Sequence, residues 1–128
     1  MPPRVVALDH LVLTVTDIEA TCAWYERLLG MHRIAFDQDR PALMFGTQKI
    51  NLHLAGVELE PHAARAAPGT ADLCFIVSDP LEEVIEFFER EKVPIEHGPV
   101  VQTGARGTMI SVYVRDPDRN LIEIASYG

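Results

Sequence analysis

The feature that most constrains this sequence is a pattern that occurs twice: an apolar, strand-like segment that runs directly into a helix start. In the first copy, residues 8–15 lead to Asp17, and in the second, residues 71–77 lead to Asp79. The two aspartates stand 62 positions apart, and the same offset pairs His10 with Asp72. An internal repeat of this kind predicts two similar modules within one chain.

Composition narrows the class of protein. With 128 residues and 48% hydrophobic side chains, the chain is long and apolar enough to form a compact core. A formal net charge of −8, with no basic stripe, argues against binding to nucleic acid or anionic membranes. No segment has the layout of a signal peptide or a membrane span, so we expect a cytoplasmic protein. Cys22 and Cys74 are expected to be reduced and buried.

The first module is predicted over about residues 4–56. A strand is followed by a helix, for which Thr16 and Glu19 form a capping-box pattern and Gly30 is a natural C-terminal cap. Strands are then predicted over 31–37, 42–47 and 49–55, with a turn over residues 38–41. Residues 57–70 are rich in proline, glycine and alanine and are predicted to link the modules.

The second module is predicted over about residues 71–128. Its helix starts with Asp79 as the cap, Pro80 in the first position and Glu82 completing a capping box. A strand near Ile95, a glycine-punctuated loop over 98–107, and strands over 108–115 and 120–126 complete it. The sequence therefore predicts an α+β fold built from two βαβββ modules.

Four polar residues lie within these apolar strands, in the first or last strand of each module: His10, His53, Asp72 and Glu123. If the strands converge, two imidazoles and two carboxylates would suit a divalent metal ion, which would also compensate for placing carboxylates in apolar strands. The alternatives are structural. His10 could be a hydrogen-bonded core residue, Asp72 a surface residue at a strand start, and Glu123 the partner of an arginine.

The opening around His10, the repeat, and the closing segments Asp116-Pro117-Asp118 and Leu121-Ile122-Glu123 resemble the vicinal oxygen chelate superfamily of glyoxalases, bleomycin resistance proteins and extradiol dioxygenases. The segments 50–53, 68–69 and 72–74 are most similar to its small glyoxalase-domain, virulence-associated branch. The resemblance implies paired βαβββ modules in an incomplete barrel around one divalent metal ion (Zn, Ni, Co, Mn or Fe). It also implies a small-molecule substrate and a homodimer.

Under this resemblance, His10 matches the histidine ligand of the first strand, and Glu123 matches the glutamate ligand of the last strand. His53 is assigned to the strand position at which glyoxalase I has a glutamate. Asp72 stands where most metal-binding members have a histidine, and Arg119 replaces the usual glycine of the final turn. All four candidates, His10, His53, Asp72 and Glu123, are therefore expected to hold the metal.

Three functions fit these residues. The first is a glyoxalase I-like lyase or isomerase, in which Glu123 or Asp72 moves a proton between neighbouring carbons. The second is an Fe(II) extradiol-type dioxygenase that uses His10, His53 and Glu123 as a set of two histidines and one carboxylate. The third is a bleomycin-type protein that binds a small molecule without chemistry. Tyr113 is expected to have a packing or surface role.

Overall fold

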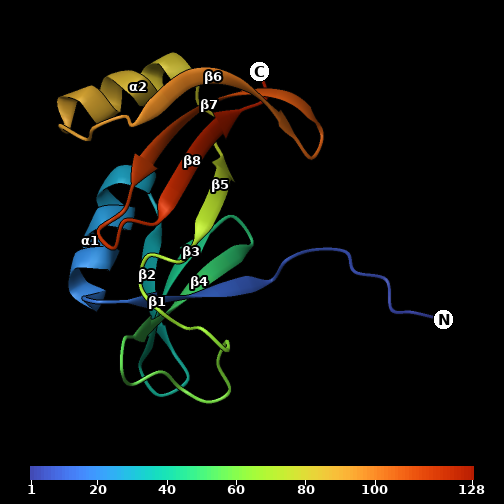
Figure 1. Ribbon diagram of the computed structural model, residues 1–128, viewed down its shortest axis with the longest axis vertical. Helices are drawn as coiled ribbons and strands as arrows, with labels where there is room; N and C mark the ends of the chain where they lie inside the picture. The colour runs from blue at the N-terminus through green and yellow to red at the C-terminus, as the bar shows by residue number, and fades with distance from the viewer. The chain divides into compact units, whose positions relative to one another are not determined.

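The computed structural model describes all residues, 1–128. The elements in chain order are β1 (His10–Val15), α1 (Ile18–Leu29), β2 (His32–Phe36), β3 (Arg40–Phe45), β4 (Gln48–Leu54), β5 (Asp72–Ile76), α2 (Leu81–Arg90), β6 (His97–Gly104), β7 (Gly107–Arg115) and β8 (Leu121–Ser126) (Figure 1). The chain divides into a first unit, Met1–Pro68, and a second unit, Gly69–Gly128. Each unit has the order βαβββ, and residues 57–70 contain no helix or strand.

Each unit contains one four-stranded sheet with the same topology. The strand order is β1-β4-β3-β2 in the first unit and β5-β8-β7-β6 in the second. In both sheets the first and last strands of the unit pair in parallel, and the remaining neighbours are antiparallel. The chain therefore places the first and last strands of each repeat side by side.

In the first unit, helix α1 packs on one face of the sheet. The side chains that the strands bury on that face are Leu13, Val15, Leu43, Ile50 and Leu52, and α1 buries Cys22, Tyr25 and Leu28. Because side chains alternate along a strand, the intervening residues point to the opposite face, which we call the open face of the first unit. That face carries His10, Val12, Thr14, Arg40, Ala42, Lys49, Asn51 and His53.

The second unit follows the same plan. Helix α2 buries Leu81 and Phe88, and the strand residues fully buried on its side are Val112, Val114, Ile122 and Ile124. The open face of the second unit therefore carries the alternate residues Asp72, Cys74, Ser111, Tyr113 and Glu123. Every sequence-predicted site residue lies on an open face and none lies beneath a helix.

The helix starts differ from the sequence prediction. Helix α1 is capped by Asp17, whose extended backbone lets its Oδ1 accept a hydrogen bond from the Ala20 amide at 3.0 Å. Thr16 is not the cap, and Glu19 forms an ion pair with Arg33 instead of completing a capping box. Helix α2 begins after Pro80, and its N-terminus has no side-chain cap, so the predicted Asp79 capping box is wrong.

The predicted loop over residues 98–107 is also wrong, because β6 runs through most of it as an eight-residue strand. Gly98 has φ +102, and a Cβ there would lie 2.5 Å from the Ser111 carbonyl oxygen. The pairing of β6 with β7 shifts between His97 and Val100. This glycine therefore marks an irregularity inside a strand, where the backbone approaches its neighbour closely.

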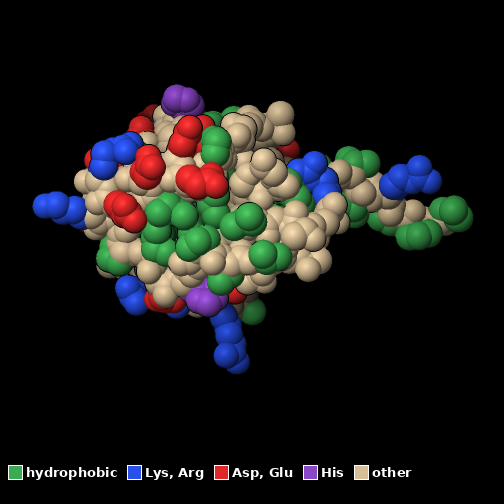
Figure 2. Space-filling view, turned by 90° about the horizontal axis from the view of Figure 1, so that it is seen from above, with side chains coloured by type: hydrophobic (Ala, Val, Ile, Leu, Met, Phe, Trp, Pro, Cys, Tyr) green, Lys and Arg blue, Asp and Glu red, His purple; other side chains and the backbone are tan.

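Charge is divided unevenly between the units. The first unit has six Lys and Arg against eight Asp and Glu, and the second has five against eleven. Helix α2 contributes four exposed glutamates, and acidic side chains gather on the face seen in Figure 2. Figure 2 also shows the N-terminal segment, residues 1–9, projecting from the first unit with exposed apolar side chains. No helix in the structure combines the length and apolar character needed to cross a membrane.

Candidate functional site

His53 is a buried histidine without a partner. His53 is only 7% exposed, and neither Nδ1 nor Nε2 of its ring forms a hydrogen bond. Two residues earlier on the same strand, Asn51 is 5% exposed, and its Oδ1 also has no partner. Buried polar atoms of this kind are costly unless a ligand satisfies them. The two residues therefore form a polar floor on the open face that is suited to a metal ion or an oxygen-rich ligand.

The protonation of His53 follows from its surroundings. Burial, and then the positive charge of Arg40, hold the pKa of His53 below its ordinary value. At neutral pH the ring is therefore uncharged, and one ring nitrogen has a free lone pair while the other carries a proton. A neutral imidazole is the form that binds a metal ion.

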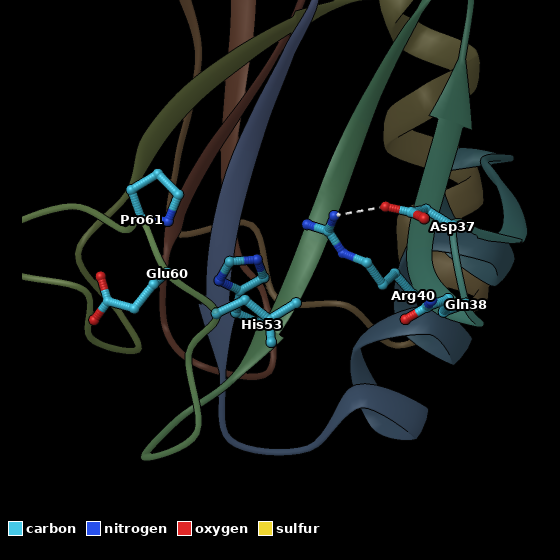
Figure 3. A pocket seen from close by; sticks show the side chains of 7 residues that line it. Asp37, Gln38, Arg40, His53, Glu60 and Pro61 are labelled. Carbon is cyan, nitrogen blue, oxygen red and sulfur yellow. Dashed lines mark ion pairs between the residues drawn. The ribbon is translucent and has the colours of Figure 1, made fainter.

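A cavity of about 520 Å³ opens beside His53. Asp37 comes from the turn between β2 and β3, Arg40 is the first residue of β3, and Leu59, Glu60 and Pro61 come from the segment after β4. Figure 3 shows the Arg40 side chain between Asp37 and the His53 ring, and the Glu60 carboxylate pointing away from that ring. The cavity thus combines one permanent positive charge, one buried neutral imidazole and the carboxylates of Asp37 and Glu60.

His10 lies at the exposed start of β1. Its Nδ1 lies 2.8 Å from the Asp9 carboxylate, and its side chain is 43% exposed. A carboxylate on Nδ1 fixes the ring tautomer and leaves Nε2 available as a metal ligand. His10 therefore has the pattern expected of a metal-binding histidine, although it is not buried.

The register of β1 with β4 sets the spacing within the first unit. His10 pairs with Lys49, Val12 with Asn51, and Thr14 with His53. His10 and His53 are therefore offset by four residues along the strands, about 13 Å at a rise of 3.3 Å per residue. The structure places both histidines on one face but does not bring them together, and Asn51 lies between their rows.

Glu123 is the centre of a hydrogen-bonded cluster on the open face of the second unit. Ser111 Oγ donates to Glu123 Oε2 at 2.6 Å from the neighbouring strand. Tyr113 lies directly opposite Glu123, and Gln102 Nε2 donates to the Tyr113 hydroxyl at 2.9 Å. Cys74 faces Glu123 from the other side. The sequence-based alternative of an arginine partner is not what holds Glu123, because Ser111 does.

The cluster changes the acidity of its neighbours. Partial desolvation of the thiol, followed by the charge of Glu123 and hydrogen bonding to it, raises the pKa of Cys74 to about 11. The same causes raise the pKa of Tyr113 above its ordinary value. Both groups therefore stay protonated and can donate hydrogen bonds to the carboxylate. Cys74 is exposed as a residue, so the expectation that both cysteines are buried holds for Cys22 alone.

The final turn fixes the start of β5, next to Asp72. Asp116 is buried and accepts hydrogen bonds from the backbone amides of Asp118 and Asn120, and Asn120 Oδ1 accepts from the Ala71 amide at 2.9 Å. This turn therefore ties the start of β5 to the start of β8. Asp72 itself is exposed and pairs with Leu121, so it shares a face with Glu123 at a diagonal position.

The strand pairings show which positions are equivalent in the repeat. Val12 pairs with Asn51 in the first unit, and its repeat equivalent Cys74 pairs with Glu123 in the second. Asn51 is thus the counterpart of Glu123, and His53 lies one row further on. Sequence reasoning missed Asn51 because the 62-residue offset does not carry through to the last strand, where equivalent residues are 72 positions apart.

Neither unit by itself contains a group of three or more His, Cys, Asp or Glu side chains close enough to hold a metal ion. Two of the predicted residues, His10 and His53, lie in the first unit, and the other two, Asp72 and Glu123, lie in the second. These side chains offer imidazole nitrogen and carboxylate oxygen atoms, which are donors that borderline divalent ions prefer.

The chain is similar to known proteins in both sequence and structure. The family sequence model of the glyoxalase/bleomycin resistance protein/dioxygenase superfamily matches residues 7–124. The virulence protein STM3117 of Salmonella typhimurium is 52% identical over 120 residues, which cover 94% of this chain and 83% of that protein. Its crystal structure aligns with a TM-score of 0.96 at 50% identity, covering 98% of this chain and 100% of the solved chain. These matches confirm the predicted α+β fold.

Other similar proteins are named for a glyoxalase domain or for an enzymatic activity. The glyoxalase domain-containing protein RDO1 of Mycosarcoma maydis is 48% identical over 121 residues, covering 94% of this chain and 68% of that protein. Biphenyl-2,3-diol 1,2-dioxygenase 3 of Rhodococcus globerulus is 26% identical over 128 residues, covering 91% and 61%. A lactoylglutathione lyase from Agrobacterium tumefaciens aligns with a TM-score of 0.73 at 25% identity, covering 98% and 96%.

Proposed function

Since the chain belongs to the glyoxalase/bleomycin resistance protein/dioxygenase superfamily, we propose that it is a metal-dependent, glyoxalase I-like enzyme. Its substrate is a small metabolite with two adjacent oxygen atoms. The residues proposed to hold the metal are drawn from His10, His53, Asp72 and Glu123; because His10 and His53 lie about 13 Å apart along the strands, only one of these two histidines would bind a given ion. Asn51 joins them as a fifth candidate because it is the repeat counterpart of Glu123.

The observation that carries this proposal is the polar floor of Asn51 and His53. Three buried polar atoms there have no partner within the protein. The donor set also fits the group: His53 is held neutral by burial, and His10 is oriented by Asp9 through Nδ1. Zn, Ni, Co, Mn or Fe bound to these residues would supply Lewis-acid polarisation of the adjacent oxygens of the substrate.

The protein would supply the proton transfer. Glu123 is the proposed base, because Ser111 fixes one carboxylate oxygen and Tyr113 flanks it on the neighbouring strand. A base held in this way can take a proton from one carbon of the substrate and return it to the next without reorganising. Asp72 is the second candidate for this role, but its exposed carboxylate has no comparable support.

The test is elemental analysis of untagged protein after chelator treatment and add-back of single metals. We expect about one tightly bound ion per chain in the wild type. One of the His10→Ala and His53→Ala variants should weaken metal binding at least about tenfold, as should Asp72→Asn and Glu123→Ala, while circular dichroism remains unchanged. Asn51→Ala tests the fifth candidate, and His32→Ala is the matched control on an exposed histidine of the same sheet.

A candidate whose variant retains full metal occupancy would be removed from the ligand set. No retention of any metal by the wild type would contradict the proposal and leave a bleomycin-type binding role. The similarity to a named dioxygenase favours a second candidate function, an Fe(II) extradiol-type dioxygenase. Oxygen uptake by the Fe²⁺-loaded protein with a catechol, absent with Zn²⁺, would identify it.

A further inference from the structure

We infer that the cavity beside His53 binds an anionic group of the substrate, a carboxylate or a phosphate, through the Arg40 guanidinium. This inference rests on the proposed function, because it places the anionic group next to a proposed metal ligand. It narrows the substrate to a small, oxygen-rich metabolite that carries a negative charge.

The position of Arg40 is the first argument. Ala42 of β3 pairs with Asn51 of β4, and continuing that antiparallel register by two residues brings Arg40 opposite His53. Both side chains line the same cavity of about 520 Å³ and also a smaller neighbouring one of about 150 Å³. Arg40 is therefore the charged group nearest the unsatisfied nitrogens of the His53 ring along this row of the sheet.

The second argument is that Arg40 is incompletely satisfied by its own partner. Its Nη1 lies 3.6 Å from the Asp37 carboxylate, and the Asp37 side chain is 70% exposed. At that distance the pair is a solvent-screened contact and not a bidentate bridge. The planar guanidinium can therefore offer its donors to an incoming oxyanion, for which it is the best-matched side chain.

The third argument is that a second cation lies near Arg40. The Phe36 ring has Arg40 over it at 4.8 Å and Lys49 over it at 3.4 Å, measured to the ring centroid. The ring holds both cations on the open face of the first unit. Arg40 lines the cavity, and the second cation held over the same ring adds to the attraction of this part of the sheet for an anionic ligand.

The acidic groups at the rim do not cancel this charge. Asp37 is the partner already described, and an anion can compete with so exposed a carboxylate. Glu60 is paired with His62, whose Nε2 lies 3.1 Å from the Glu60 carboxylate, and Figure 3 shows that carboxylate directed away from His53. Arg40 is therefore the one cation of the lining, and neither carboxylate of the lining forms a close bridge to it.

The experiment titrates inorganic phosphate, and separately acetate, into chelator-treated full-length protein at constant ionic strength. Binding is followed by ¹H–¹⁵N NMR of the Arg40 and His53 side chains and nearby amides. Arg40→Gln should weaken anion binding at least about tenfold, and Arg40→Lys should restore part of it. Asp37→Asn should tighten binding a few-fold, because it removes the competing carboxylate. Arg27→Gln is the matched control: it removes the same charge from helix α1.

Saturable binding that is lost in Arg40→Gln and kept in Arg27→Gln would support the inference, and the tighter of the two anions would identify the group. Equal binding in the wild type and Arg40→Gln, weaker binding in Asp37→Asn, or no saturable binding of either anion would overturn it. Metal content is measured separately in the same proteins. Because the titration uses metal-free protein, failure of the wild type to bind metal would contradict the proposed function while leaving the anion result to stand.

Discussion

At the residue scale, the reactivity of the Cys74 thiol depends on the charge of Glu123. Its pKa of about 11 means that only about 0.1% is thiolate at pH 8, and the thiolate is the reactive form. In metal-free protein we therefore expect slow alkylation of Cys74 by iodoacetamide, rising about tenfold per pH unit up to about pH 11. Glu123→Gln should accelerate the reaction at pH 8, because it removes the negative charge that opposes thiolate formation.

The measurement is best made in a Cys22→Ser background, so that Cys74 is the remaining thiol. A rate that levels off near pH 8.5 would show that the thiol is unperturbed. A Glu123→Gln variant with an unchanged rate would show that burial alone, without the carboxylate, sets the acidity.

The candidate residues show what a sequence can reveal about a site. His10, His53, Asp72 and Glu123 stand out as polar residues in apolar strands, and the structure places all four on open faces. Asn51 is not conspicuous in a sequence, because its importance comes from burial and an unpartnered oxygen. The turn residues around Arg40 predict a loop, whereas Arg40 begins β3 and lines the cavity through a register that only strand pairing defines.

At the element scale, the two helices end differently. Helix α1 ends at Gly30, with φ +64 and no atom within 4 Å of an added Cβ. Helix α2 is followed by Lys92 at φ +59, and the Val93 amide donates to the Phe88 carbonyl at 2.8 Å, as in a Schellman motif. The same left-handed conformation is thus occupied by glycine in one unit and by lysine in the other.

We expect opposite effects from exchanging these residues. Gly30→Ala should lower the free energy of unfolding by about 1 kcal/mol, because the left-handed region is unfavourable for a residue with a Cβ. Lys92→Gly should raise it by about 0.5–1 kcal/mol for the same reason. Chemical denaturation checks both, and Lys92→Ala is the control that keeps the strain. A stabilising Gly30→Ala would contradict the account.

Elements were predictable where local patterns and tertiary packing agree. The two helices, the first and last strands of each module and the Gly30 cap follow from periodicity and glycine placement. β6 was not predictable, because Gly98 has the local appearance of a loop residue and its role depends on the close approach of Ser111. The caps at Asp17 and Pro80 differ from prediction because adjacent residues compete for one position and backbone conformation decides among them.

At the scale of the whole molecule, the homodimer implied by the family resemblance stays a prediction. The structure leaves Val5 and Val6 exposed at 87% and 90%, and Val12 and Ile76 at 44% and 48%. Apolar surface of this kind favours association. We expect sedimentation velocity at micromolar concentration to give a species of twice the 14.3 kDa chain mass, weakened by deleting residues 1–7. A 14.3 kDa species at every concentration would contradict it.

The uneven division of charge has a kinetic consequence. The second unit carries a net −6 and the first a net −2. A negatively charged molecule that diffuses toward this protein is therefore repelled more strongly by the second unit than by the first. Mobile ions shorten the range of such fields to about 10 Å at 0.1 M salt. Added salt should therefore raise the association rate of an anion, and it should also weaken the ionic contact between the bound anion and Arg40. Both the association rate constant and the dissociation rate constant of the anion would then rise with ionic strength, with opposite effects on its affinity.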